Sequence, residues 1–399
     1  MKIERILLCW MAVVFAGCSG CRQRSLHDAD CGAVTDSIRL QYAPDRRDDV
    51  FAVNIVRRNG RVILEGFTSV EAAKTALRTR IQAVCPEAID SVALLPDHTV
   101  GDQPYGVVNI SVADSRQEAN HAAEMGTQLL LGMPLQVLQR DGWWRIKSPE
   151  GYLGWMEGNA FVRMDRDRFN QWTAARKIIF TDIYGFAYES PDATRHVSDL
   201  VFGNLLKWEG DSGEFFKVSY PDGRMAYIPK HQGRRYEDWL SSVRLTEESI
   251  VQKALMLKGI PYTWGGTSVK SMDCSGFVKT VMLMHGVILR RDASQQAKTG
   301  IPVDVTDGYD LLRPGDLLFF GRKAQNGKRE RVRHVALYIG NKEFIHANGY
   351  VRINSLDSTQ AHYDRYNTRE LIRAARIIGA TGTDGIRNMD NHPLYQEQK

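Results

Sequence analysis

An internal repeat restricts the middle of this chain to one kind of fold. The stretches LLLGMPLQVLQRDGWWRIKSPEGYLGWME and FGNLLKWEGDSGEFFKVSYPDGRMAYIPK share an apolar-Gly start, an acidic-Gly turn, an aromatic pair, Lys-x-Ser and a second turn with an acid before Gly. Short runs of Val, Leu, Ile and Trp between such turns indicate β-strands. A repeat with this spacing predicts two small all-β barrels in tandem, which we place at residues 113–178 and 179–243.

The remaining sequence predicts further domains, because 399 residues are too many for one hydrophobic core. Alternating apolar and polar residues on both sides of Asn59-Gly60 predict a β-hairpin. With the helical and strand-like patterns that follow, they indicate a small α+β domain over 46–112. A second α+β unit is expected over 244–379, and the polar tail 380–399 is expected to be disordered. The chain is therefore a multidomain protein.

The N-terminus has the features of an export signal. Lys2 and Arg5 precede an apolar run that is about half the ~20 residues needed to span a bilayer, and the run ends in Ala-Gly-Cys. This ending resembles a bacterial lipoprotein cleavage site. We therefore expect a signal peptide over 1–18, lipidation of Cys18 and a polar tether over 19–45. These features predict a lipid-anchored protein of the cell envelope that faces the periplasm.

Charge and cysteine content narrow the possible partners. The net charge is +5, but basic and acidic residues are interleaved and no nucleic-acid-binding motif occurs. We expect no nucleic acid partner, whereas a mildly basic surface suits an anionic polymer such as a cell wall. In an oxidising envelope Cys31 and Cys85 could form a disulfide, which the sequence leaves open. We expect a monomer.

One cysteine and two histidines in the C-terminal unit point to nucleophilic catalysis. Cys274 in MDCSGF precedes an apolar helical pattern, so it should lie in the first turn of a helix, where the positive dipole end lowers a thiol's pKa. His334 in RHVALYIG begins an alternating strand, and His346 in EFIHANG falls on the next strand. The first imidazole could then exchange a proton with the thiol, and the second could orient the first.

Less specific interpretations exist for each of these three residues. A lone cysteine in an apolar helix is more often inert core, and either histidine could be a hydrogen-bonded structural residue. A structural zinc site would need a fourth ligand and short paired spacings, which this pattern lacks. We therefore predict neither a metal nor a cofactor.

The motifs GIPYTWGG, MDCSGF, LRPGDLLFF, RHVALYIG and EFIHANG, in that order, resemble the NlpC-type cell-wall cysteine endopeptidases, a papain-like α+β family. The resemblance covers residues 246–378. It implies that Cys274 is the nucleophile, His334 the general base and acid, and His346 the orienting residue. It also implies positions that bind the substrate or its oxyanion: Tyr262, Asp273, Ser275 and Ser294.

The two barrels resemble the bacterial SH3-like domains of wall-associated proteins, and this combination resembles the subgroup that acts on muropeptides. The resemblance implies hydrolysis of the bond between γ-D-glutamate and a diamino acid, meso-diaminopimelate or lysine, in a peptidoglycan stem. Glu124 aligns with an acid that binds a free N-terminal L-alanine, and Tyr152 or Trp155 could form an aromatic wall. Two alternatives are a hydrolase of intact peptidoglycan, whose barrels anchor it to the wall, and a non-catalytic wall-binding lipoprotein.

Overall fold

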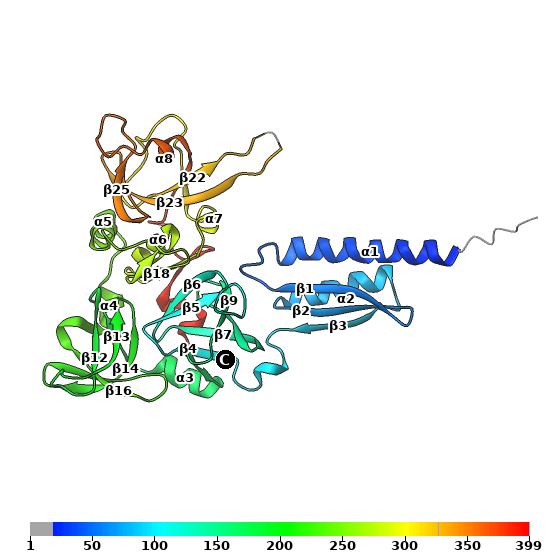
Figure 1. Ribbon diagram of the computed structural model, residues 1–399, viewed down its shortest axis with the longest axis horizontal. Coiled ribbons are helices and arrows are strands. Elements are labelled where there is room, and N and C mark those ends of the chain that lie inside the picture. Colours follow the sequence, from blue (N-terminus) through cyan, green and yellow to red (C-terminus); the bar gives the residue numbers. More distant parts are fainter. Residues whose placement is uncertain (1–18, 326, 399) are drawn as a thin grey trace, which may run out of the picture. The chain divides into compact units, whose positions relative to one another are not determined.

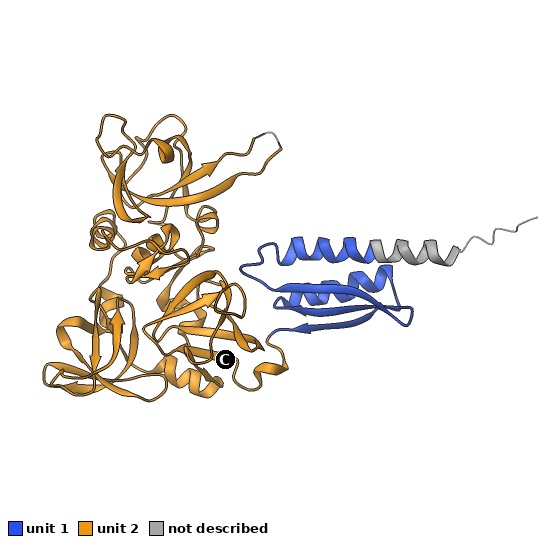
Figure 2. Ribbon diagram, viewed as in Figure 1, with its two compact units in different colours: residues 1–95 blue, residues 96–399 orange. Residues whose placement is uncertain are grey.

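The computed structural model describes residues 19–325 and 327–398, with side chains from Asp30 onward (Figure 1). The chain divides into two compact units, Met1–Leu95 and Pro96–Lys399 (Figure 2). The predicted signal peptide 1–18 and the predicted lipidation site Cys18 lie outside the described residues.

The first unit is a three-stranded sheet with two helices. Its elements are α1 (Ser19–Tyr42), β1 (Phe51–Arg58), β2 (Arg61–Thr68), α2 (Glu71–Val84) and β3 (Ile89–Leu94). Strands β1 and β2 form the predicted hairpin, and Asn59 and Gly60 both adopt the positive φ that a tight two-residue turn requires. Strand β3 pairs with β2 in parallel, after the crossover through α2.

The prediction of a polar tether over 19–45 is wrong, because helix α1 occupies most of this segment. Ile38 and Cys31 on α1 are fully buried in one cluster with Leu77 and Ile81 of α2. These apolar side chains hold the helix on the domain, whereas the polar composition of the segment suggested an extended linker. Cys85 is buried in the same cluster as a free thiol, so a disulfide between Cys31 and Cys85 is not present.

The second unit begins with two β-rich domains. The strands of the first are β4 (Tyr105–Val108), β5 (Val112–Arg116), β6 (Met125–Leu130), β7 (Pro134–Asp141), β8 (Trp143–Lys147), β9 (Leu153–Met156) and β10 (Phe161–Met164). The strands of the second are β11 (Lys177–Phe180), β12 (Tyr184–Tyr188), β13 (His196–Val201), β14 (Leu205–Ser212), β15 (Phe215–Ser219), β16 (Met225–Pro229) and β17 (Gly233–Arg235). Short helices accompany them: η1 (His98–Val100), α3 (Arg166–Ala174), η2 (Lys230–Gln232) and α4 (Tyr236–Ser242).

The two sheets have the same topology, in agreement with the sequence repeat. The first has the order β10-β4-β7-β8-β9-β5-β6, and the second, read from β17, has β17-β11-β14-β15-β16-β12-β13. The boundary predicted at residue 112 is wrong, because β4 pairs with β7 and β10 and therefore belongs to the first barrel. The small α+β domain ends at Leu95 instead.

The C-terminal domain is an α+β fold built on a six-stranded sheet of order β21-β26-β22-β23-β24-β25. Its strands are β21 (Ile301–Val303), β22 (Leu317–Arg322), β23 (Arg331–Gly340), β24 (Glu343–Asn348), β25 (Tyr350–Ser355) and β26 (Leu371–Arg376). Its helices are α5 (Glu247–Met256), α6 (Cys274–Leu283), α7 (Ala293–Gln296) and α8 (Arg365–Arg369). Two small pairings complete it: β18 (Thr267–Ser268) with β19 (Ser271–Met272), and β20 (Val287–Leu289) with β27 (Ile386–Asn388).

Helix α6 is the central helix of this domain, because every one of its residues is buried. It packs against β23 and β24, and Figure 1 shows α5, α6 and α7 on one side of the sheet. Phe277 and Val278 of α6 lie in one apolar cluster with Val335 and Ile345 of the sheet. The same cluster includes residues of both barrels, so the first residue of α6 is held in a continuous core.

The tail 380–399 is ordered where the structure describes it, contrary to our expectation. It contains β27, η3 (Met389–Asn391) and η4 (Pro393–Tyr395). Leu394 is buried with Val107 and Phe169, and Nε2 of His392 lies 2.8 Å from the carbonyl oxygen of Pro149. A few apolar side chains in a polar segment therefore fix it against the first barrel, a contact that composition alone does not indicate.

Candidate active site

Cys274 is the first residue of α6, as the sequence predicts, and its position is fixed by the turn before it. The Asp273 carboxylate caps the helix by accepting a hydrogen bond from the Gly276 N–H at 2.7 Å. A Cβ atom on Gly276 would lie 2.0 Å from the Gly266 carbonyl oxygen, so only glycine allows this close approach. The start of α6 is therefore held tightly against the loop that carries GIPYTWGG.

The thiol is protonated in the free protein, contrary to the lowered pKa that we expected. Burial and, to a smaller extent, the neighbouring Asp273 carboxylate raise the pKa of Cys274 to about 12. A hydrogen bond from the Val335 backbone N–H and the charge of Arg291 oppose this shift without cancelling it. The desolvation of a thiolate thus outweighs the stabilisation offered by the helix N-terminus.

Asp273 and Ser275, on either side of the thiol, take part in a buried ion-pair network with Arg291. Arg291 donates to Asp273 through Nη2 at 2.6 Å and through Nη1 at 3.1 Å. Nη1 also donates to Ser275 Oγ at 2.9 Å. All three side chains are buried. These hydrogen bonds position the start of α6. The predicted contact of Asp273 and Ser275 with substrate stays a prediction.

His334 and His346 belong to a hydrogen-bonded chain that defines their tautomers. Asn354 Nδ2 donates to the His362 carbonyl at 2.9 Å, so Asn354 Oδ1 is the acceptor for His346 Nε2–H at 3.0 Å. Nδ1 of neutral His346 is then an acceptor, and it receives a hydrogen bond from His334 Nε2–H at 2.7 Å. Nδ1 of His334 is left with its lone pair, as a proton acceptor must be.

Both imidazoles are neutral at neutral pH. Burial lowers the pKa of His346 to about 4, although its hydrogen bond to Asn354 opposes the shift. Burial also places the pKa of His334 well below its usual value, and repulsion from His346 when it is protonated, from Arg333 and from Arg352 adds to that effect. The site therefore combines a neutral thiol with a neutral base.

The strand that carries His334 reaches the thiol, because Val335, the next residue, donates its backbone N–H to Cys274. Tyr262 reaches the same point from another loop, whose backbone is held by the hydrogen bond from the Tyr262 N–H to the Gly349 carbonyl at 2.9 Å. Burial and the nearby Cys274 raise the pKa of the Tyr262 hydroxyl, which therefore remains a hydrogen-bond donor. Three separated sequence motifs thus meet around one sulfur atom.

The first barrel contributes two of the predicted residues to this region. Glu124 accepts a hydrogen bond from Trp264 Nε1 at 2.5 Å, which places its carboxylate beside the loop that carries Tyr262. Tyr152 is buried, and its hydroxyl donates to Asp292 of the C-terminal domain at 3.3 Å.

The other two predicted residues lie on β9 and α7. Trp155 is half-buried, and the Arg145 guanidinium lies 5.6 Å from its ring centre. Ser294 is half-buried on the short helix α7. Their predicted roles remain predictions.

A second buried ion pair joins the first barrel to α6. Lys279 Nζ lies 2.6 Å from Glu150 Oε1, and both side chains are almost fully buried. Neither this ion pair nor Arg291 or Asn354 was predicted from the sequence to be part of the site. An arginine and a lysine in otherwise apolar runs were the available signals, but their partners are distant in the sequence. Asn354 had no distinguishing signal.

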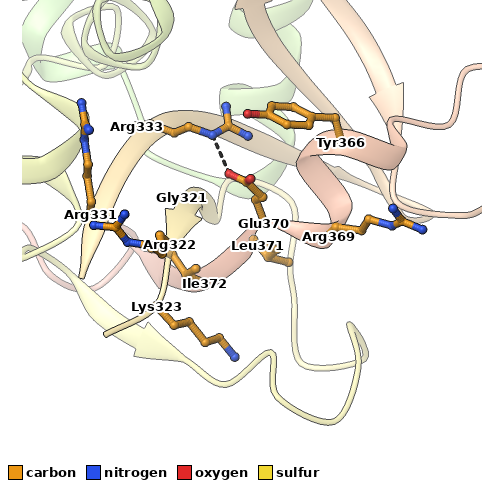
Figure 3. Close-up of a pocket in the computed structure, with 10 residues that line it drawn as sticks. All are labelled: Gly321, Arg322, Lys323, Arg331, Arg333, Tyr366, Arg369, Glu370, Leu371 and Ile372. Atoms are coloured by element: carbon orange, nitrogen blue, oxygen red, sulfur yellow. Dashed lines mark hydrogen bonds and ion pairs between the residues drawn. The ribbon is translucent and has the colours of Figure 1, made fainter. Parts of the chain in front are cut away.

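The C-terminal domain also has a recess of about 730 Å³. It is lined by Arg322, Lys323, Arg331, Arg333 and Arg369, together with Tyr366 and Glu370 (Figure 3). Within the described part of the chain, no cluster of three or more His, Cys, Asp or Glu could hold a metal ion. The helices formed by the described residues are all too short or too polar to cross a membrane.

Comparisons with known proteins agree with this arrangement. Residues 259–376 match the NlpC/P60 family, and residues 116–167 match the bacterial dipeptidyl-peptidase SH3 domain. A gamma-D-glutamyl-L-lysine dipeptidyl-peptidase of Bacillus cereus is 28% identical over 243 residues, which are 59% of this chain and 70% of that protein. A probable endopeptidase NlpC of Escherichia coli is 36% identical over 117 residues, 28% of this chain and 70% of that protein.

The fold is also similar to a solved structure. A crystal structure of an NlpC/P60 family protein from Bacillus cereus matches with a TM-score of 0.59 and 23% identity. The match covers 68% of this chain and 99% of that one. The match therefore extends beyond the C-terminal domain.

Proposed function

Because the chain belongs to the NlpC/P60 family of cysteine peptidases, we propose that it hydrolyses the bond between γ-D-glutamate and the diamino acid of peptidoglycan stem peptides. One observation carries the assignment of residues. The hydrogen-bonded chain from Asn354 through His346 leaves His334 Nδ1 as a base, and the next residue on that strand contacts the Cys274 sulfur.

The proposed reaction is acyl transfer from the peptide to Cys274 and then to water. His334 Nδ1 removes the thiol proton as the sulfur attacks the γ-carbonyl carbon, because no thiolate exists beforehand. Backbone N–H groups at the start of α6 and the Tyr262 hydroxyl donate hydrogen bonds to the oxyanion. His334 then protonates the leaving nitrogen of the diamino acid as the C–N bond breaks.

The second half of the reaction, hydrolysis of the thioester, uses the same residues. His334 accepts a proton from water, the hydroxide oxygen attacks the thioester carbonyl, and the C–S bond breaks. The sulfur recovers its proton from His334. His346 stabilises each positively charged form of His334 through the 2.7 Å hydrogen bond, and Asn354 holds His346 in the required tautomer.

We place the N-terminal end of the peptide at Glu124. Its exposed carboxylate lies next to the Tyr262 loop, where it can form an ion pair with the ammonium group of an unblocked L-alanine. An acylated stem has no such cation, so this contact favours trimmed peptides over intact wall. The Bacillus cereus relative is named a dipeptidyl-peptidase, and residues 116–167 of this chain match the bacterial dipeptidyl-peptidase SH3 domain. Both names support the same choice.

The decisive experiment incubates the protein with L-Ala-γ-D-Glu-meso-diaminopimelate and with its N-acetylmuramoyl form, and detects products by mass spectrometry. We expect release of L-Ala-γ-D-Glu from the free peptide and no release by Cys274→Ala. Equal cleavage of both substrates would support a hydrolase of intact wall. Cleavage of neither would support a wall-binding protein without activity.

We also propose that the protein is anchored in the cell envelope through a lipid on Cys18, facing the periplasm. The signal-like N-terminus and a substrate found in the cell wall support this location. Metabolic labelling with a fatty acid should mark the wild-type protein and not Cys18→Ala. Equal labelling of both would contradict the anchor.

A further inference from the structure

Two arginines lie close enough to the histidine pair to lower the pKa of His334, and they differ in their partners. The charge of Arg333 is paired with a carboxylate. Its Nε donates to Glu370 at 2.7 Å, its Nη2 donates to Asn367 at 3.0 Å, and its guanidinium lies 4.3 Å from the Tyr366 ring centre (Figure 3). The charge of Arg333 is therefore already balanced within the protein.

Among the described residues, Arg352 has no carboxylate that pairs with its charge. It is half-buried on β25, and its Nε is buried without a hydrogen-bond partner. No carboxylate of the described residues lies within ion-pair distance of it; its recorded contact is the Tyr350 ring, 5.7 Å from the guanidinium carbon. Burying part of an unpaired charge is unfavourable. A group from outside the protein is the natural partner.

The position of Arg352 indicates which part of the substrate would supply that group. Arg352 is the direct cross-strand neighbour of His346, so both side chains lie on the same face of the sheet. Tyr350, under the guanidinium, forms a β-bridge with Pro261, the residue before Tyr262. Arg352 therefore lies beside the histidine pair and close to the loop at the thiol.

The proposed chemistry places the leaving diamino acid on this side. His334 must reach the leaving nitrogen in order to protonate it, so the rest of that residue lies around the histidine pair. Lysine and meso-diaminopimelate differ there by one group: the side chain of meso-diaminopimelate ends in a carboxylate next to its amine. A carboxylate is also the ligand that a guanidinium binds with two parallel hydrogen bonds.

We propose that Arg352 binds the side-chain carboxylate of meso-diaminopimelate and thereby makes the enzyme select this residue over lysine. The proposal rests on the proposed function. It separates this chain from its Bacillus cereus relative, whose name specifies L-lysine. A hydrogen-bonded ion pair of this kind corresponds to roughly a 10-fold to 100-fold preference.

The test compares three tripeptides that share L-Ala-γ-D-Glu and end in meso-diaminopimelate, in L-lysine, or in meso-diaminopimelate amidated on its side-chain carboxyl. All three keep the same α-carboxylate, so differences in kcat/KM report the side-chain carboxylate. We expect the wild type to prefer the first peptide, and Arg352→Gln to reduce that rate to the level of the other two. Arg352→Lys should retain part of the preference.

Arg369→Gln is the matched control, because Arg369 is an exposed arginine of the same domain and lines the recess of Figure 3. It should leave the preference unchanged. Equal wild-type rates on all three peptides, or an Arg352→Gln variant that slows all three equally, would overturn the assignment. Cleavage of none of them by the wild type would instead refute the proposed function, and with it the assignment.

Binding provides a readout that does not depend on turnover. In the Cys274→Ala background, calorimetry should show tighter binding of the diaminopimelate peptide than of the lysine peptide, and adding Arg352→Gln should remove the difference. Unchanged affinities would contradict the proposal. Matching circular dichroism spectra would show that Arg352→Gln is folded.

Discussion

His334 Nε2 lies 2.7 Å from His346 Nδ1, and this contact determines which nitrogen of the catalytic base is free. Since His346 must donate through Nε2 to Asn354, it can only accept through Nδ1 when neutral. His334 therefore donates through Nε2 and keeps the lone pair on Nδ1. The direction of proton transfer is set at Asn354, two hydrogen bonds away from the base.

Substitution of Asn354 tests this chain. Asn354→Leu removes the acceptor for His346, so His346 can rotate or change tautomer, and we expect kcat/KM to fall about tenfold or more. Asn354→Asp keeps an acceptor at the same place and should retain more activity at neutral pH. The two variants should differ in kcat rather than in KM. Equal activity of Asn354→Leu and the wild type would show that the chain does not set the tautomer.

The acid side of the pH profile should lie unusually low. The pKa of His346 is about 4 and that of His334 is also well below 6.5, so the base stays neutral as the pH falls through 6.5. We expect kcat/KM to be maintained as the pH falls through 6.5 and to decrease only at lower pH. A decrease centred near 6.5 would mean that the histidines titrate normally.

The lowered pKa values of His334 and His346 also make the folded protein less stable at acidic pH. The unfolded histidines bind protons near pH 6.5, whereas the folded ones do so only at lower pH, so protonation favours the unfolded chain. The contribution of the pair to the free energy of unfolding is complete above 6.5 and is lost as the pH falls towards 4.

Alkylation should reveal the protonated thiol. Because the pKa of Cys274 is about 12, the rate of its reaction with iodoacetamide should rise with pH throughout the range 6 to 9. Mass spectrometry of the peptide that contains Cys274 separates this signal from the other cysteines. Glutathione measured in parallel should react faster at each pH. A plateau below pH 8 would instead indicate a preformed thiolate-imidazolium pair.

The sequence predicted the topology better than the electrostatics. The repeat predicted two equivalent barrels, and the motif order placed Cys274, His334 and His346 on the correct elements, because these depend on local patterns. The predicted lowering of the Cys274 pKa was wrong, because this pKa depends on how deeply the start of α6 is buried. Burial is determined by Phe277 and Val335 packing from distant parts of the chain.

Partner residues that are distant in the sequence were equally hard to predict. Lys279 and Glu150 are 129 residues apart, and the sequence pattern around Glu150 indicated only a turn. Leu394 lies in a segment whose composition is typical of a disordered tail, yet it is buried against Val107. The burial of Lys279, Glu150 and Leu394 is thus determined by residues far away in the sequence, which the local composition does not reveal.

Glu124 can be tested by removing its charge without changing its shape. Glu124→Gln keeps an oxygen acceptor for Trp264 but cannot form an ion pair with the ammonium group of L-alanine. We expect kcat/KM for the free tripeptide to fall about 10-fold to 100-fold. The N-acetylated peptide, which has no cation, should be cleaved at an unchanged low rate. Equal losses on both peptides would remove Glu124 from substrate recognition.

Arg291 should be essential for stability although it performs no chemistry. Arg291→Met leaves the Asp273 carboxylate buried without a counter-ion, and breaking such a pair typically costs about 3–5 kcal/mol. Denaturant unfolding followed by tryptophan fluorescence should show an earlier transition. Arg195→Met is the control, since Arg195 and its partner Glu189 are both exposed, and exposed pairs contribute about 0–1 kcal/mol.

The double variant Asp273→Asn with Arg291→Met separates the ion pair from the helix cap. Asn at position 273 is neutral but can still accept the hydrogen bond from the Gly276 N–H. Much of the stability lost in Arg291→Met should therefore return, because no uncompensated charge remains. If the double variant is as unstable as Arg291→Met, the loss comes from the missing packing of the arginine side chain, and the buried charge pair is not what holds the start of α6.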